Sequence, residues 1–412
     1  MRPEPVPRDG RPHPVHAFGY ETFGPILAEF AQRLWLFQRF VPSPEAATLL
    51  FCARGGLRLH AIYERFLLRT GLAPTVPFDT LMVSRLIAAR MATPNPSDAL
   101  LDELGREFRD CSMAEVAACL AQRDDLDLSP PWFEVYRPDA FCSLAAGARD
   151  LQAAIGAQNA LFRAHLDGRT AGRPTVILCD TGLYGSTVRL LREAMPERRW
   201  LSVQFARSNY KNYAAPHFDV TVGLSVERDL YAPWDLRSCV LRFWHLVESV
   251  LEPDLPSARA FAVPPGGGEA RANTEVPSWR ERILPGGPCL FSGALAYIDD
   301  LTPGRLDGLE GEAIRGWHRL RRSLIRPRPS DLPLLSLDDR SRDFGRKEQV
   351  AQFAEQRGTA ARIRASLWRE GALVKAHPRL GFATLPVLEA VHLLRAIRAG
   401  WGGPDRHGRA TA

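Results

Sequence analysis

The chain has 412 residues, 45% of them hydrophobic and 24% charged, so it can bury at least one full core and is not a disordered protein. It contains no uncharged apolar run of about eighteen residues, and Met1 to Pro5 is not the start of a signal peptide, so we expect a cytoplasmic protein without membrane association. The net charge of +6 is small for this length, and arginines and aromatic residues do not recur at a fixed spacing. We therefore do not expect a nucleic-acid partner.

In the first part of the chain, residues 1–16 are rich in proline and arginine and are predicted to form a loose arm. Apolar residues at helical spacing predict a packing helix over 23–40. The continuous apolar run 48–53 is typical of a parallel strand that is buried on both faces. Arg54-Gly55-Gly56 ends this strand, and a helix is predicted over 57–69.

A weaker strand is predicted over 80–84, followed by Arg85 and a helix that reaches Met91. Residues 98–124 and 144–167 are expected to be helical. The Pro-rich segment 129–132 separates them as a loop.

Residues 176–179 form the next predicted buried strand, which ends at Asp180, and 201–205 and 220–224 are two further candidates. Strands that alternate with helices predict an α/β fold with a doubly wound, mostly parallel sheet. Ligands of such sheets bind at the carboxyl ends of the strands. We therefore expect Arg54 and Asp180 at the same edge of one sheet.

A change in composition at the Pro- and Gly-rich segment 264–268 predicts a linker. Beyond it, 315–324 and 346–370 are Arg-rich and predicted to be helical, and 386–397 is predicted to be a last helix with Pro386 at its first position. The predicted organisation is an arm (1–16), an α/β domain (17–265) with a helical insertion at about 95–170, and a linker with a helical C-terminal region (266–412).

Seven scattered cysteines without a Cys-x-x-Cys pair predict reduced thiols, most of them buried, with Cys179 inaccessible on its strand. The histidines are not spaced as metal ligands, so no metal site made by the protein alone is expected.

Two segments carry chemistry. In Asp180-Thr181-Gly182-Leu183-Tyr184-Gly185-Ser186-Thr187, an acid ends a strand, and glycines and hydroxyl residues then open a helix, which lets backbone N–H groups and hydroxyls converge on a phosphate. In Arg54-Gly55-Gly56, two glycines permit close backbone approach while Arg54 offers a fork to a second phosphate. Arg85 follows another strand and is a candidate third contact, although a solvated or salt-bridged arginine is the more common case.

The spacing of strand, acid and Tyr184-Gly185-Ser186-Thr187 resembles the sugar-phosphate loop of type I phosphoribosyltransferases, and Arg54-Gly55-Gly56 resembles their pyrophosphate loop. The resemblance implies that Asp180 holds the ribose hydroxyls, that Leu183 to Thr187 wrap the 5-phosphate, and that the donor is bound with Mg²⁺. Gly185 and Thr187 are the clearest matches. The candidate catalytic residues are Asp180 and Arg54, and the candidate ligand-binding residues are Gly55, Gly56, Arg85, Thr181, Leu183, Tyr184, Gly185, Ser186 and Thr187.

The sequence departs from that family at three points. Cys179 stands where a first acid is usual, and Tyr184 where Thr or Ser is usual. About 125 residues separate the two loops, which requires a helical insertion where the family usually has a flexible hairpin.

A second resemblance covers roughly residues 18–260. Phe23-Gly24-Pro25, the Arg54 loop, Leu81 to Arg85 and the Asp180 loop are similar in order to the domain found behind haloacid-dehalogenase-like modules in bacterial capsule and polysaccharide biosynthesis proteins. That domain usually reads Ala-Arg-Asp-Gly at the first loop, so Gly55 is a departure that makes the loop more transferase-like. The resemblance implies kinship without a reaction.

A phosphatase of the dehalogenase class is not expected. Phe78-Asp79-Thr80-Leu81 is similar to the end of its nucleophile motif, but the positions just upstream are Val76 and Pro77, which carry no carboxylate.

The sequence thus predicts a phosphoribosyltransferase-like enzyme that binds phosphoribosyl diphosphate, or a related phosphorylated sugar or nucleotide, with magnesium. The alternative is an accessory protein of surface-polysaccharide or secondary-metabolite biosynthesis that binds a nucleotide-sugar-like ligand or a partner protein. A third alternative, an interaction scaffold, rests on the Arg-rich helices after residue 300. Homo-oligomerisation and a biosynthetic partner protein both remain open.

Overall fold

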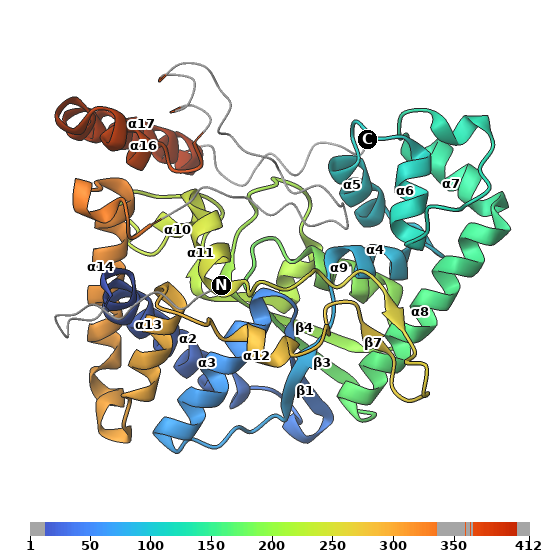
Figure 1. Ribbon diagram of the computed structural model, residues 1–412, viewed down its shortest axis with the longest axis horizontal. Coiled ribbons are helices and arrows are strands. Elements are labelled where there is room, and N and C mark those ends of the chain that lie inside the picture. Colours follow the sequence, from blue (N-terminus) through green and yellow to red (C-terminus); the bar gives the residue numbers. More distant parts are fainter. Residues whose placement is uncertain (1–12, 336–358, 360–362, 364–365, 402–412) are drawn as a thin grey trace.

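A computed structural model describes residues 13–335, 359, 363 and 366–401. Within this part of the chain, five strands form one all-parallel sheet in the order β2-β1-β3-β4-β5, and two form a small antiparallel pair (Figure 1). The α/β fold with a parallel sheet is therefore confirmed. The strands are β1 (Ala47–Cys52), β2 (Phe78–Leu81), β3 (Thr175–Asp180), β4 (Arg199–Arg207), β5 (Thr221–Glu227), β6 (Phe261–Ala262) and β7 (Arg271–Ala272).

Helices surround the sheet and extend beyond it on two sides (Figure 1). The α-helices are α1 (Pro14–Phe18), α2 (Gly24–Gln38), α3 (Gly55–Thr70), α4 (Arg85–Ala92), α5 (Asp98–Glu107), α6 (Met113–Ala121), α7 (Pro138–Gly147), α8 (Arg149–Thr170), α9 (Ser186–Ala194), α10 (Cys239–Arg242), α11 (Trp244–Leu251), α12 (Trp279–Ile283), α13 (Leu290–Asp299), α14 (Leu309–Ile325), α16 (Arg369–Ala376) and α17 (Pro378–Trp401). Short helical turns are η1 (Gly19–Phe23), η2 (Pro44–Ala46), η3 (Pro130–Phe133), η4 (Pro216–Val220), η5 (Pro303–Gly308) and η6 (Pro329–Asp331).

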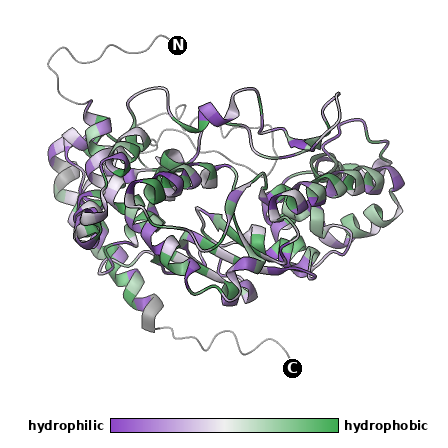
Figure 2. Ribbon diagram, turned by 90° about the horizontal axis from the view of Figure 1, so that it is seen from below, coloured by the Kyte–Doolittle hydropathy of each residue, from purple (hydrophilic) through white to green (hydrophobic). Residues whose placement is uncertain are grey.

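Each face of the sheet belongs to a different hydrophobic core. Successive residues of β1 alternate between the cores: Leu49 and Phe51 pack with α2, α3, α13 and α14, whereas Leu50 and Cys52 pack with α4, α5, α6 and α8. Such alternation follows from the period of two along a strand. The apolar run in β1 is unbroken because both of its faces are covered by helices, and Figure 2 shows the hydrophobic colouring of the strands between the helices.

The chain reverses its direction of travel across the sheet between β1 and β3. It passes from β1 to β2 on one side and then crosses back to β3 on the other side of β1. The pairing of Phe51 with Cys179 places the ends of β1 and β3 level with each other. Arg54 and Asp180 therefore lie at the same edge, as predicted, and a reversal of this kind opens a crevice between the two following loops.

Several predicted boundaries differ from the structure. The strand predicted at 80–84 lies at Phe78–Leu81, and the helix predicted over 98–124 is divided into α5 and α6. The division occurs because Ser112 and Glu115 form a capping box that starts a new helix. The last helix does not begin at Pro386, which lies inside α17; Pro378 is its first residue instead.

Five α-helices, α4 to α8, lie between β2 and β3, and the last four of them, α5 to α8, fall where the insertion was predicted. Segment 264–268 joins β6 to β7, which pair as a hairpin. In the C-terminal region, α13 and α14 pack on α2 and share its core. The domain boundary near residue 265 stays a prediction. Most of the predicted arm and of the 346–370 helix lies outside the described residues.

No helix of the described residues is long and apolar enough to cross a membrane.

All seven cysteines are free thiols and Cys179 is buried on its strand, both as predicted. The prediction that most of the thiols are buried is wrong: Cys52, Cys179 and Cys239 are buried, whereas the other four are half-buried, because they lie in the insertion or at the start of α13. Burial raises the pKa of each of the three buried thiols. We expect seven thiols to react with a thiol reagent in denaturant, and Cys52, Cys179 and Cys239 to resist alkylation in the native protein. A disulfide found by mass spectrometry in the native protein is the contradicting result.

Candidate functional site

The ends of β1, β2 and β3 open into one cleft with a volume of about 710 Å³. This volume is within the range of small-molecule sites. Its wall includes ten of the eleven candidate residues: Arg54, Gly55, Arg85, Asp180, Thr181, Leu183, Tyr184, Gly185, Ser186 and Thr187. Gly56 does not line it; an added Cβ there would meet the backbone of Phe51 and Cys179, so this glycine lets α3 pack closely against the sheet.

The two predicted loops touch each other. Gly55 is the first residue of α3, and a Cβ at this position would lie 2.5 Å from Cγ2 of Thr181. The loop from Asp180 to Gly185 is held against β4 by backbone bonds from Ala206 to Thr181 and from Ser208 to Leu183. Contact between the loops places the first turns of α3 and α9 beside one cleft.

Gly185 precedes α9 with φ +75°, a left-handed conformation that glycine adopts without strain. The first turn of α9 is buried, and α4 also begins at the cleft, where Ser84 accepts from the backbone N–H of Ile87 at 3.3 Å. Three helix N-termini therefore face the same cleft. The N–H groups of a helix's first turn and the helix dipole favour an anionic ligand.

Asp180 ends β3 at the floor of the cleft. Its Oδ1 accepts from the backbone N–H of Thr181 at 2.7 Å. Desolvation raises the pKa of Asp180 to about 6, against the lowering effects of the Thr181 hydrogen bonds and of Arg85, while Glu248 raises it further. Carboxylates with a raised pKa are typical of functional sites. Little water surrounds the Asp180 carboxylate, so its charge is available to a ligand.

The two arginines singled out in the sequence both have acidic partners. Arg54 lies 2.6 Å from Glu252, just after α11, and Arg85 lies 2.9 Å from Glu107, the last residue of α5. Each guanidinium is thus positioned by a carboxylate at the rim of the cleft. Glu248 and His245 of α11 extend the same wall as Glu252, and His245 Nδ1 lies 3.0 Å from Glu248.

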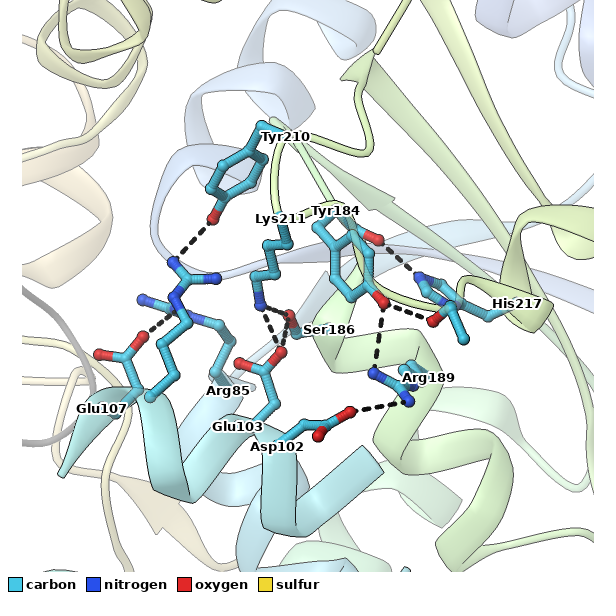
Figure 3. Close-up of polar contacts among 12 residues, drawn as sticks. Arg85, Asp102, Glu103, Glu107, Tyr184, Ser186, Arg189, Tyr210, Lys211 and His217 are labelled. Carbon is cyan, nitrogen blue, oxygen red and sulfur yellow. Dashed lines mark hydrogen bonds and ion pairs between the residues drawn. The ribbon is translucent and has the colours of Figure 1, made fainter. Parts of the chain in front are cut away.

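Sequence reasoning missed a buried ion pair next to the phosphate loop. Lys211 Nζ contacts the carboxylate of Glu103 on α5 and donates to Ser186 Oγ at 2.8 Å, and Ser186 in turn donates to Glu103 at 2.8 Å (Figure 3). Both charged side chains are 1% exposed. Burial lowers the pKa of Lys211 to about 8. Burial opposes ionisation of Glu103 as well, but attraction to Lys211 holds its pKa below the ordinary value.

The sequence carried only a weak signal for this pair. The chain has three lysines among 53 basic residues, and Lys211 is the one that follows a predicted strand. Glu103 lies in the insertion, about eighty residues from the loop, and no local pattern connects the two.

Tyr184 is 2% exposed, and its hydroxyl is used inside the protein. It donates to the carbonyl of Ala214 at 2.7 Å and accepts from Arg189 at 3.2 Å, while Lys211 Nζ lies 4.6 Å from the ring centre (Figure 3). Tyr184 therefore shapes the loop by packing, and the Ser186 hydroxyl is likewise engaged by Lys211 and Glu103. The groups of this loop that can donate hydrogen bonds to a phosphate are therefore its backbone N–H groups.

Within the described part of the chain, no three Asp, Glu, His or Cys side chains are grouped so that they could hold a metal ion by themselves. Magnesium commonly binds through one or two carboxylates together with substrate phosphates, and Asp180 offers such a carboxylate in the cleft. The donor set fits a metal that arrives with a diphosphate ligand.

A scan against protein-family models gives no match, and a search of the curated proteins gives none either. The resemblance to phosphoribosyltransferases therefore rests on the residues of the two loops. The site itself is the edge of an α/β sheet where three helix N-termini, Arg54 and Asp180 meet in one cleft.

Proposed function

We propose that the cleft binds phosphoribosyl diphosphate or a closely related sugar phosphate, and that the protein is a phosphoribosyltransferase-like enzyme. One observation carries the proposal: the two loops that resemble the family's phosphate loops, far apart in the sequence, touch at Gly55 and Thr181. They do so at the sheet edge where the strand order reverses. Helices on both faces of the sheet support the finer assignment of a doubly wound, phosphoribosyltransferase-like fold.

The proposed roles follow from position in the cleft. Backbone N–H groups from Gly185 to Thr187 hold the 5-phosphate at the start of α9, and Arg54 lies over the diphosphate. Asp180 binds the ribose hydroxyls and stabilises the positive charge that develops at the anomeric carbon. In the reaction, the bond from that carbon to the diphosphate oxygen breaks and its electron pair leaves with the diphosphate. A lone pair of the acceptor forms the new bond to the carbon, and the proton that the acceptor loses passes to water.

Asp180 is the carboxylate of the cleft that would hold a magnesium ion arriving with the ligand, and the metal would neutralise charge on the leaving group. The pKa of Asp180, raised to about 6, leaves this carboxylate mostly ionised at neutral pH. The acids Glu248 and Glu252 on the opposite wall keep the cleft from being uniformly cationic.

A melting-temperature assay with phosphoribosyl diphosphate and MgCl₂ tests the proposal. At one hundred times the dissociation constant, a ligand stabilises the native state by about 2.7 kcal/mol, which gives a clear upward shift. Ribose 5-phosphate and MgCl₂ alone are the controls and are expected to give smaller shifts. Absence of any shift at millimolar phosphoribosyl diphosphate would rule the proposal out.

A second candidate is an accessory protein that binds such a ligand without turnover. The observation that favours it is the ion pair between Arg54 and Glu252, since a guanidinium already paired is less available to a leaving group. Release of diphosphate from the bound donor, with water as acceptor, separates the two. Stoichiometric binding without release supports the accessory role.

A further inference from the structure

The cleft has a second cationic wall that the two loops do not provide. It is formed by Arg85 on α4 and Arg106 on α5; the buried Lys211, in the loop after β4, lies close to both but does not line the cleft. Their charges lie close enough that Arg85 and Arg106 both help to lower the pKa of Lys211. Two of the three have carboxylate partners, Glu107 for Arg85 and Glu103 for Lys211 (Figure 3).

Arg106 differs from its two neighbours. Within the described residues it makes no ion pair; its Nη2 donates to the hydroxyl of Tyr210 at 3.1 Å, and its guanidinium lies 5.3 Å from the centre of the Tyr210 ring. Nη1 of Arg106 is buried and has no hydrogen-bond partner in the described part of the chain. An unsatisfied buried donor is costly, and a charged one more so, unless a ligand accepts from it.

Arg106 also differs from other arginines with a buried nitrogen because it lines the cleft. Arg169 and Arg189 also have a buried nitrogen without a hydrogen-bond partner among the described residues, but this nitrogen is Nε, and neither residue lines the cleft. Arg106 and Tyr210 both line it, together with Arg85 and the start of α9. Tyr210 thus holds one nitrogen of a guanidinium that belongs to a residue of the cleft wall, while Nη1 of the same guanidinium has no acceptor within the described residues.

We propose that Arg106 binds an oxyanion of the ligand, a phosphate or a carboxylate, and that Tyr210 is the positioning residue for its guanidinium. A guanidinium held on one side by the Tyr210 hydroxyl can bind a planar carboxylate or a tetrahedral phosphate, which accept charge-assisted hydrogen bonds from arginine. The helical insertion then contributes directly to recognition. This deepens the proposed function, on which it rests for the identity of the cleft as the ligand site.

Calorimetric titration with inorganic diphosphate and, separately, with malonate tests the proposal and distinguishes phosphate from carboxylate. For the oxyanion that binds, Arg106→Ala is expected to weaken affinity about 10- to 100-fold, the loss of one charge-assisted bond. Arg106→Lys keeps the charge but not the fork and should weaken it nearly as much. Tyr210→Phe keeps the ring and removes the hydroxyl, so it is expected to lower the oxyanion affinity by a smaller factor. It also provides the test if Arg106→Ala does not fold.

Arg163→Ala is the matched control, because Arg163 is a surface arginine paired with Glu197 and does not line the cleft. Its affinity should equal that of the wild type. Equal affinity of the Arg106 and Arg163 variants, or failure of the wild type to bind either oxyanion, overturns the proposal.

Melting-temperature assays with phosphoribosyl diphosphate, combined with these titrations, separate this inference from the proposed function. If phosphoribosyl diphosphate shifts the melting temperature of the wild type and of Arg106→Ala equally, the assignment of Arg106 fails while the proposed function stands. If it shifts neither, but diphosphate or malonate binds with dependence on Arg106, the oxyanion site stands and the proposed function fails.

Discussion

Lys211→Met is expected to lower the free energy of unfolding by about 3–5 kcal/mol, the effect of leaving one buried charge without its partner. Glu103 would remain 1% exposed with only Ser186 as a hydrogen-bond donor among the described residues. Since the pair also connects α5 to the start of α9, the cleft should become more open to solvent. Urea unfolding monitored by circular dichroism measures the loss.

Two further variants make this result specific. Lys375→Met removes an exposed lysine and should change stability by less than about 0.5 kcal/mol. Glu103→Met combined with Lys211→Met should recover most of the stability, because two apolar side chains replace a buried pair at little cost. A loss below about 1 kcal/mol for Lys211→Met alone would contradict the assignment of a tightly coupled buried pair.

Asp180→Asn is expected to make the ligand-free protein more stable at pH 7, by about 1–3 kcal/mol. The pKa of Asp180 is about 6 in the folded protein and 3.8 as its ordinary value, so the native state binds more protons between these values and stability falls as the pH rises through them. The full difference corresponds to about 3 kcal/mol, less what partial solvent exposure removes. Asparagine retains the acceptor for Thr181 but never ionises.

The pH dependence of the stability difference tests whether desolvation of the Asp180 charge causes it. Urea unfolding of wild type and Asp180→Asn should agree below about pH 4, diverge between pH 4 and pH 6, and differ by a constant amount above pH 6. Asp254→Asn, at a fully exposed side chain, should follow the wild type within about 0.5 kcal/mol. A stability difference that is independent of pH would show that desolvation of the Asp180 charge is not its origin.

Under the proposed function, the same variant should lose activity while gaining stability. Removing one preorganised electrostatic group commonly lowers turnover about 10²- to 10³-fold, and diphosphate release from phosphoribosyl diphosphate measures it. Donor binding should change less, since Gly185 to Thr187 and Arg54 remain. Full activity in Asp180→Asn would remove Asp180 from the proposed mechanism.

Local patterns in the sequence determined the central strands of this protein and the loops that follow them. The unbroken apolar runs of β1 and β3 predicted buried parallel strands, because only strands covered on both faces need no polar side. Polar and glycine residues directly after those strands predicted which residues would meet at the sheet edge. Parallel pairing of neighbouring strands then brings Arg54 and Asp180 together without further information.

Tertiary structure alone decided the environment of the cleft. Glu103 and Arg106 lie on α5, within the insertion between β2 and β3, and Lys211 and Tyr210 follow β4, so their contacts depend on how the insertion packs over the sheet. Such contacts join residues about a hundred positions apart and leave no periodic pattern in the sequence. The partners of Arg54 and Arg85 and the burial that raises the pKa of Asp180 arise from that packing. So does the position of Arg106, whose Nη1 has no hydrogen-bond partner in the part of the chain that the structure describes.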